Sequence, residues 1–265
     1  MTLEQVIANL DLPDGARVDR RVAKKLVAEY SPRHRGKAIR QGIERLRWIA
    51  ALKPGNCAIP AGVIPQAVLD KPVGETFPVE EVSVLTLEAR SDAHLPTVVK
   101  AIHEAIPYLV LLLTTQENRL HISLAWKRPS LSQQAKSVLL VGLQDAQPVD
   151  LTAPEPLQSA LLDALAVGAP PVRDLAALYR RWAAALLAAR VATVTGTFEL
   201  VQDADSLESR QALLDEYGRL SKEIPRLTRE FKRATQLRDR VELSTKIKCV
   251  EAELARVAAR LNESH

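Results

Sequence analysis

The amino-acid sequence predicts an α+β protein with a small, mostly antiparallel sheet covered by helices, a basic helical N-terminus and a long C-terminal coiled-coil or helical-hairpin tail. In the middle of the chain, segments with the two-residue periodicity of strands surround one amphipathic helix. Basic residues concentrate near the N-terminus, and apolar residues recur at steps of four and three over the last quarter. With 265 residues, 47% of them hydrophobic, the chain is long enough to bury a sizeable core.

These observations divide the chain into four parts. Residues 1–52 are expected to form the basic helical segment, 53–80 a Pro-rich connection, 81–200 the α+β body and 207–265 the tail. The connection holds five prolines and three glycines before residue 79, too many for a regular element, so we expect it to lie irregularly over the body.

The N-terminal part is expected to hold three helices. The first covers 3–10 and ends at a run of turn-forming residues, and the second runs from about Asp19 to Tyr30. The third begins at Ser31-Pro32, because apolar residues beyond it recur at the spacing of one helical face: Ile39, Ile43, Leu46 and Ile49.

The body is expected to contain four strands and one helix. Residues 82–88 have the alternation and β-branched content of a strand, and 95–106 place apolar residues on one helical face. A short polar turn joins 108–114 to 120–127 as a hairpin, and 137–142 supply the fourth strand.

Helices return after the sheet. Residues 154–165 and 172–191 are amphipathic and are expected to cover the sheet. The following stretch, 192–200, is either a further strand or an extended lead into the tail.

The tail carries a heptad seam that changes phase near 238–241 and contains Pro225. One interpretation is an antiparallel hairpin that turns near 235–239. The other, which we slightly favour because no Gly or Pro marks a turn there, is a continuous, kinked helix that pairs with another chain. The seam residues expected to bind a partner, which includes the option of a homo-oligomer, are Leu213, Tyr217, Leu220, Ile224, Leu227, Phe231, Leu243, Ile247, Val250, Leu254, Val257 and Leu261.

Positive charge is unevenly placed. Residues 16–48 carry eleven Lys or Arg against three Asp or Glu, a net +8, whereas residues 51–206 carry a net −4. Such a segment can follow a phosphate backbone without reading base sequence, so we expect nucleic-acid binding. The competing interpretation is that these charges solvate outer helix faces or dock on the acidic body. The residues expected to bind nucleic acid are Arg17, Arg20, Arg21, Lys24, Lys25, Arg33, Arg35, Lys37, Arg40 and Arg47.

Several stretches together resemble one bacterial family over nearly the whole chain. They read Arg17-Val-Asp-Arg-Arg-Val-Ala-Lys-Lys25, Ala105-Ile-Pro107, Leu120-His-Ile-Ser-Leu-Ala-Trp-Lys127, Leu175-Ala-Ala-Leu-Tyr179, Arg229-Glu-Phe-Lys-Arg-Ala-Thr-Gln236 and Arg240-Val-Glu-Leu243. The chain is similar in these stretches to the family catalogued as domain of unknown function number 4391. Genes of that family often lie beside helicase and DNA methyltransferase genes of restriction-like defence systems. The resemblance therefore implies an accessory or scaffold subunit with such a partner, and it implies no catalytic residues.

The sequence shows no Gly-x-Ser-x-Gly, no Gly-rich phosphate loop and no His or Cys cluster with metal-ligand spacing. We therefore expect neither enzyme activity nor a cofactor or metal. The alternative is a metal-dependent nuclease or other effector subunit, because Glu88-Ala-Arg90 weakly resembles the Glu-x-Lys that such nucleases place on a strand.

The expected location is the cytoplasm. The N-terminus shows no secretory signal, and no apolar run reaches the eighteen residues of a membrane span. Cys57 and Cys249 lie far apart in the sequence and are expected to stay reduced.

Overall fold

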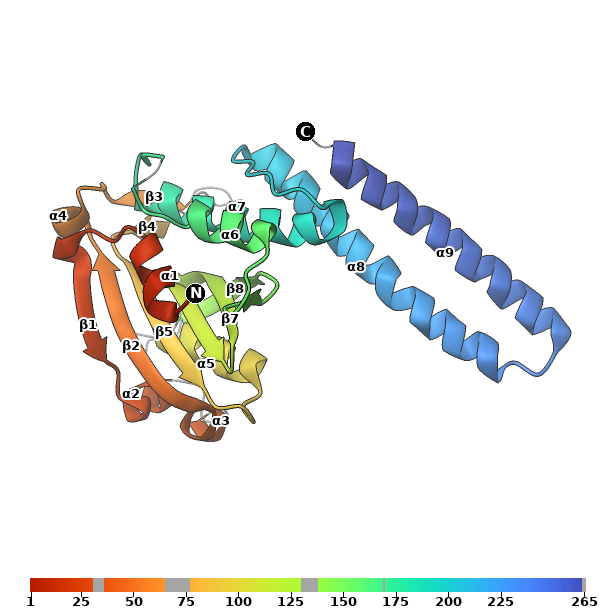
Figure 1. The fold of residues 1–265 in the computed structure, drawn as a ribbon, viewed down its shortest axis with the longest axis horizontal. Helices are drawn as coiled ribbons and strands as arrows, with labels where there is room; N and C mark the ends of the chain where they lie inside the picture. The colour runs from red at the N-terminus through yellow and green to blue at the C-terminus, as the bar shows by residue number, and fades with distance from the viewer. Residues whose placement is uncertain (31–35, 65–76, 130–137, 169, 264–265) are drawn as a thin grey trace. The chain divides into compact units, whose positions relative to one another are not determined.

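The computed structural model describes the following residues: 1–30, 36–64, 77–129, 138–168 and 170–263 (Figure 1). The chain divides into two compact units, Met1–Leu186 and Leu187–His265. The fold is a mixture of helices and strands, and the C-terminal stretch is helical, as the sequence predicts. None of the helices in the described ranges is long and apolar enough to cross a membrane.

The first unit is built on one mixed sheet. Its strands are, in spatial order, β1 (Arg17–Arg21), β2 (Ile43–Leu52), β5 (Val82–Ala89), β6 (Leu109–Gln116), β7 (Arg119–Pro129) and β8 (Val138–Asp145), with β9 (Val149–Asp150) also paired to β7. Strands β5 and β6 run parallel because helix α5 (Leu95–Ala105) crosses between them, and the other neighbours are antiparallel. The expectation of a mostly antiparallel sheet is therefore corrected to a mixed one.

The N-terminal part differs from the three expected helices. Helix α1 (Leu3–Asn9) is confirmed and is followed by the short η1 (Asp14–Ala16), but the second expected helix begins as strand β1 before α2 (Lys24–Tyr30). The third ends as α3 (Gly36–Gly42), and the chain continues as β2.

Irregular pairing in β2 explains this error. The register between β2 and β5 shifts between Ile43 and Arg45 and again between Trp48 and Ala50. Each irregularity changes the alternation of inward and outward side chains. As a result, Ile43 and Leu46 are both buried although they lie three residues apart, which imitates the spacing of a helical face.

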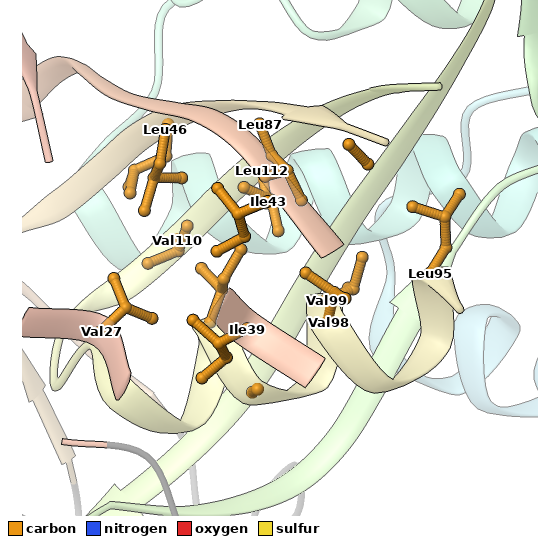
Figure 2. Close-up of a cluster of buried hydrophobic side chains, with 14 residues drawn as sticks. Val27, Ile39, Ile43, Leu46, Leu87, Leu95, Val98, Val99, Val110 and Leu112 are labelled. Carbon is orange, nitrogen blue, oxygen red and sulfur yellow. The ribbon is translucent and has the colours of Figure 1, made fainter. Parts of the chain in front are cut away.

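One face of the sheet is covered by α2, α3 and α5. Val27 of α2 and Ile39 of α3 join side chains of α5, β2, β5 and β6 in one buried cluster (Figure 2). Helices α3 and α5 approach closely at Gly42, where an added Cβ would lie 2.6 Å from Val98 Cγ2. The close contact favours a residue without a side chain and sets the end of α3 against α5.

Helices α6 (Pro156–Ala164) and α7 (Leu175–Thr195) confirm the two helices expected after the sheet. Trp182 of α7 is fully buried, and its indole nitrogen donates to the Leu165 carbonyl at 2.8 Å. The Tyr179 hydroxyl accepts the Ala125 amide hydrogen at 2.9 Å and lies 3.1 Å from the Val110 carbonyl oxygen. These bonds attach α7 to the middle of the sheet.

The Pro-rich connection contains short regular elements, contrary to expectation. These are α4 (Pro54–Cys57), β3 (Gly62–Ile64) and β4 (Phe77–Val79), and the two strands pair antiparallel. Gly62 is needed because a Cβ there would lie 2.4 Å from Asp174 Oδ1. Residues 65–76 lie outside the described part of the chain.

The second unit contains an antiparallel helical hairpin of α8 (Ala204–Arg233) and α9 (Leu237–Glu263). Leu213 and Leu220, in the first part and the middle of α8, cluster with Val257 and Leu261 near the end of α9. The favoured interpretation of one continuous helix is therefore wrong. The backbone becomes extended at Ala234, with φ −66° and ψ 126°, so α8 ends there and a three-residue turn leads into α9.

The stretch before the hairpin is not a strand. Helix α7 continues to Thr195 and ends at Gly196, whose φ of +79° is the left-handed conformation that commonly terminates helices. Residues 197–203 then lead into α8 without regular structure, which agrees with the second of the two alternatives.

Candidate functional site

The edge of the sheet at β1 carries exposed cations. All five residues of β1 are exposed, and the pairing of β1 with β2 places Arg21 directly opposite Arg47. Like charges at such cross-strand positions destabilise a sheet. The repulsion is partly offset by Asp19, whose carboxylate pairs with Arg47 from an irregularity in β1 where the Asp19 φ is 42°.

Three cations line a surface cavity of about 310 Å³ beside this edge. Its charged lining residues are Arg21 from the end of β1, Lys24 from the start of α2 and Arg45 from β2, and the rest of the lining is apolar. Among its lining residues there is no acid. Guanidinium groups bind phosphate through two parallel hydrogen bonds, so the chemistry of this cavity suits an anion.

The structure gathers only part of the predicted nucleic-acid set here. Of those residues, Arg17, Arg20, Arg21, Lys24, Lys25 and Arg47 lie on β1, β2 and the start of α2; we call these six together with Arg45 the basic edge. Lys37 and Arg40 are exposed on α3, while Arg33 and Arg35 lie outside the described residues.

Arg45 was missed by the sequence prediction, although it lines the cavity. Its guanidinium also lies 3.3 Å from the carboxylate of Glu88 on β5. A strand interpretation of β2 would have identified Arg45 and Arg47 as two steps apart on one face. The indole N–H of Trp48, next to Arg47 on β2, donates to the Ala50 carbonyl at 3.0 Å.

The predicted partner-binding seam lies within the hairpin. Five of its residues are buried between α8 and α9 or beside them: Leu213, Leu220, Leu227, Val257 and Leu261. The other seven are half-buried: Tyr217, Ile224, Phe231, Leu243, Ile247, Val250 and Leu254. The seam therefore serves first to hold the hairpin together, and only its half-buried margin remains accessible.

A second cavity, of about 400 Å³, lies between the start of α5 and strands β7 and β8. Its polar lining comes from His94, Gln116, His121, Ser123 and Asp145. Burial lowers the pKa of His121, Arg119 lowers it further, and Asp145 acts in the opposite direction. His121 is therefore mainly neutral at physiological pH.

Behind this cavity, buried polar groups of α5 and β7 meet. His103 Nε2 lies 3.1 Å from the Ser123 hydroxyl, and burial, followed by the nearby Lys127 cation, holds the pKa of His103 well below its usual value. The Lys127 ammonium donates to the carbonyls of Ile106 at 2.8 Å and Tyr108 at 2.5 Å, and burial lowers its pKa to about 7. No sequence pattern indicates this group, because its members are scattered along the chain.

The alternative nuclease site centres on Glu88, near the end of β5. Glu88 is half-buried and is paired with Arg45. Across the described ranges, no group of three or more His, Cys, Asp or Glu side chains is arranged to hold a metal ion. Neither cysteine takes part in a disulfide; Cys57 is buried and Cys249 is exposed.

Together, the fold and the basic edge define a mixed α/β protein that carries a helical hairpin and an exposed basic surface at its sheet edge. Residues 10–254 match the family model described as Domain of unknown function (DUF4391). Because the match covers nearly the whole chain, the protein belongs to this family, which confirms the resemblance seen in the sequence. No curated protein and no solved structure shows significant similarity to it.

Proposed function

We propose that this protein is a non-catalytic accessory subunit of a restriction-like defence complex and that it binds nucleic acid through the basic edge. The observation that carries the proposal is the cavity that Arg21, Lys24 and Arg45 line from three elements, with no acid among its lining residues, although Arg45 is also paired with Glu88 on β5. A phosphate group of a polynucleotide fits this chemistry.

A competing account is that these cations only protect an exposed edge strand from pairing with other chains. Two features favour binding over protection. Arg45 lies on β2, which is paired on both sides, so it is not needed at the edge. The opposed pair Arg21 and Arg47 costs stability, whereas isolated edge charges would protect the strand without that cost.

The proposed protein partner is a helicase or DNA methyltransferase, which rests on the typical gene neighbourhood of the family. The half-buried margin of the hairpin seam would supply the apolar contacts. Charged residues flank this margin along both helices, which suits a partner helix with a matching charge pattern.

The experiment measures DNA affinity of the full chain at several salt concentrations. The test variant combines Arg21→Gln, Lys24→Gln and Arg45→Gln. The matched control variant combines Arg219→Gln, Lys222→Gln and Arg256→Gln, which removes the same charge from the hairpin. Losing three phosphate contacts lowers the slope of log K against log salt by about 2.7, since each contact contributes about 0.9.

The control variant is expected to keep the wild-type slope. Equal slopes for the test and control variants would exclude the basic edge as the binding surface. Mg²⁺-dependent DNA cleavage that is lost on Glu88→Ala would overturn the accessory role in favour of the nuclease.

A further inference from the structure

The half of the hairpin that contains the turn between α8 and α9 is strongly basic. Residues 226–248, which we call the hairpin tip, include the end of α8, the turn and the start of α9, and they carry eight Lys or Arg against three Asp or Glu, a net +5. The rest of the second unit, residues 187–225 and 249–265, carries six bases and ten acids, a net −4. Charge is therefore separated along the length of the hairpin.

Some of the tip cations already have partners. Arg226 bonds Glu230 at 2.7 Å, Lys246 bonds Glu242 at 2.6 Å, and the Arg240 guanidinium lies 5.0 Å from the centre of the Phe231 ring. In the part of the chain that the structure describes, the remaining exposed cations of the tip with no ion pair are Arg229, Lys232, Arg233, Arg238 and Lys248.

Four cations of the tip lie at helix ends, where the helix dipole acts on them. Lys232 and Arg233 lie in the last turn of α8, where the helix dipole favours cations. Arg238 and Arg240 lie in the first turn of α9, where the dipole is positive and favours an anion such as Asp239, which lies between them. The helix dipole therefore explains the positions of Lys232 and Arg233, but it does not explain those of Arg238 and Arg240.

The tip also exposes large apolar side chains. Leu237 is 78% exposed and Val241 60% exposed, although both lie in a helix that buries apolar residues elsewhere. Exposed aliphatic groups and cations placed against the dipole both cost stability. Leu237, Val241, Arg238 and Arg240 lie together within about one turn of α9, so the exposed apolar groups and the cations share one surface.

We propose that the hairpin tip is a second nucleic-acid-binding surface, separate from the basic edge. Its five arginines and three lysines extend over about 18 Å of α9 and the adjoining end of α8, a length that spans several phosphates of a polynucleotide. Leu237 and Val241 contact sugars or bases between the phosphate contacts. A membrane surface fits less well, since it would require a continuous apolar face along the helix.

This inference depends on the proposed function only for the class of ligand, so both surfaces are tested with the same full-length protein. The tip variant combines Lys232→Gln, Arg233→Gln and Arg238→Gln, none of which breaks an ion pair in the described structure. It is compared with the basic-edge variant and with the control variant at Arg219, Lys222 and Arg256. The probes are labelled duplex DNA, labelled single-stranded DNA and vesicles containing phosphatidylserine.

We expect the tip variant to bind DNA about tenfold more weakly or worse at moderate salt, with a salt slope reduced by about 2.7. The control variant has the same net charge as the tip variant, so a shared loss would mean that only total charge matters and would overturn the proposal. Vesicle binding that is lost in the tip variant while DNA binding is unchanged would also overturn it.

The combination of variants separates the two surfaces. If the basic-edge variant weakens binding and the tip variant does not, the tip inference fails and the proposed function stands. If only the tip variant weakens binding, the basic edge fails and the tip stands. If the wild-type chain binds neither form of DNA, both proposals fail.

Discussion

The buried hydroxyl of Tyr179 allows a quantitative test of how α7 is held on the sheet. This hydroxyl accepts the Ala125 amide hydrogen at 2.9 Å, and its own hydrogen is shared between the carbonyl oxygens of Ala125 at 3.0 Å and Val110 at 3.1 Å. In Tyr179→Phe the ring remains but the Ala125 N–H loses its partner inside the core. An unsatisfied buried polar group costs about 1–3 kcal/mol, so we expect the free energy of unfolding to fall by about 2 kcal/mol.

The assay is urea unfolding followed by tryptophan fluorescence. Trp126 lies 5.2 Å from the Tyr179 ring centre and Trp182 lies 6.4 Å from it, so the signal reports on the packing of α7 against the sheet. The midpoint should shift without a change in the m-value. Tyr108→Phe is the control, because Tyr108 is 44% exposed and its loss of a hydroxyl should change stability by less than about 0.5 kcal/mol. Equal midpoints for the two variants would refute the importance assigned to this hydroxyl.

Two further predictions concern stability. Burial lowers the pKa of Lys127 to about 7, so between pH 7 and its unfolded value of 10.5 the unfolded chain holds one more proton than the native one. The unfolding free energy of the wild type relative to Lys127→Met should therefore rise by about 1.4 kcal/mol per pH unit in this window and stay flat below pH 7. Urea unfolding of both proteins across the window measures this difference. A difference that does not change with pH would contradict the prediction. Pro225 is exposed inside α8 and has no N–H to donate to the Ser221 carbonyl, so Pro225→Ala should stabilise the hairpin by up to about 3 kcal/mol. The variant should have a higher melting temperature, measured by circular dichroism. A lower melting temperature would show that the proline is needed.

The body of the protein was largely predictable because its signals are local. The strand expected at 82–88 is observed as β5, and the helix expected at 95–106 is observed as α5. The apolar run that continues from residue 108 becomes β6, which is fully buried over Leu109–Leu113 as expected for a central strand. In these segments, one periodicity continues without interruption and identifies the element by itself.

The N-terminal part was not predictable in the same way. In β2 the shifts in register place Ile43 and Leu46 on one side, so a strand carries the spacing of a helix. Arg45 was not among the candidate site residues, although Arg47 was, and only the strand geometry places the two on one face of β2. The group of His103, Ser123 and Lys127 was also out of reach, since α5 and β7 meet only in the folded sheet.

The sequence by itself determined the family, the uneven distribution of charge and the two-part seam of the tail. Each depends only on residue type and spacing along the chain. The tertiary structure alone decided that the two seam halves pair with each other and that Arg21, Lys24 and Arg45 share a cavity. The hairpin closes because α8 and α9 bury leucines and valines against each other, which stabilises the folded chain. These contacts join residues up to about fifty positions apart, so no local sequence pattern encodes them.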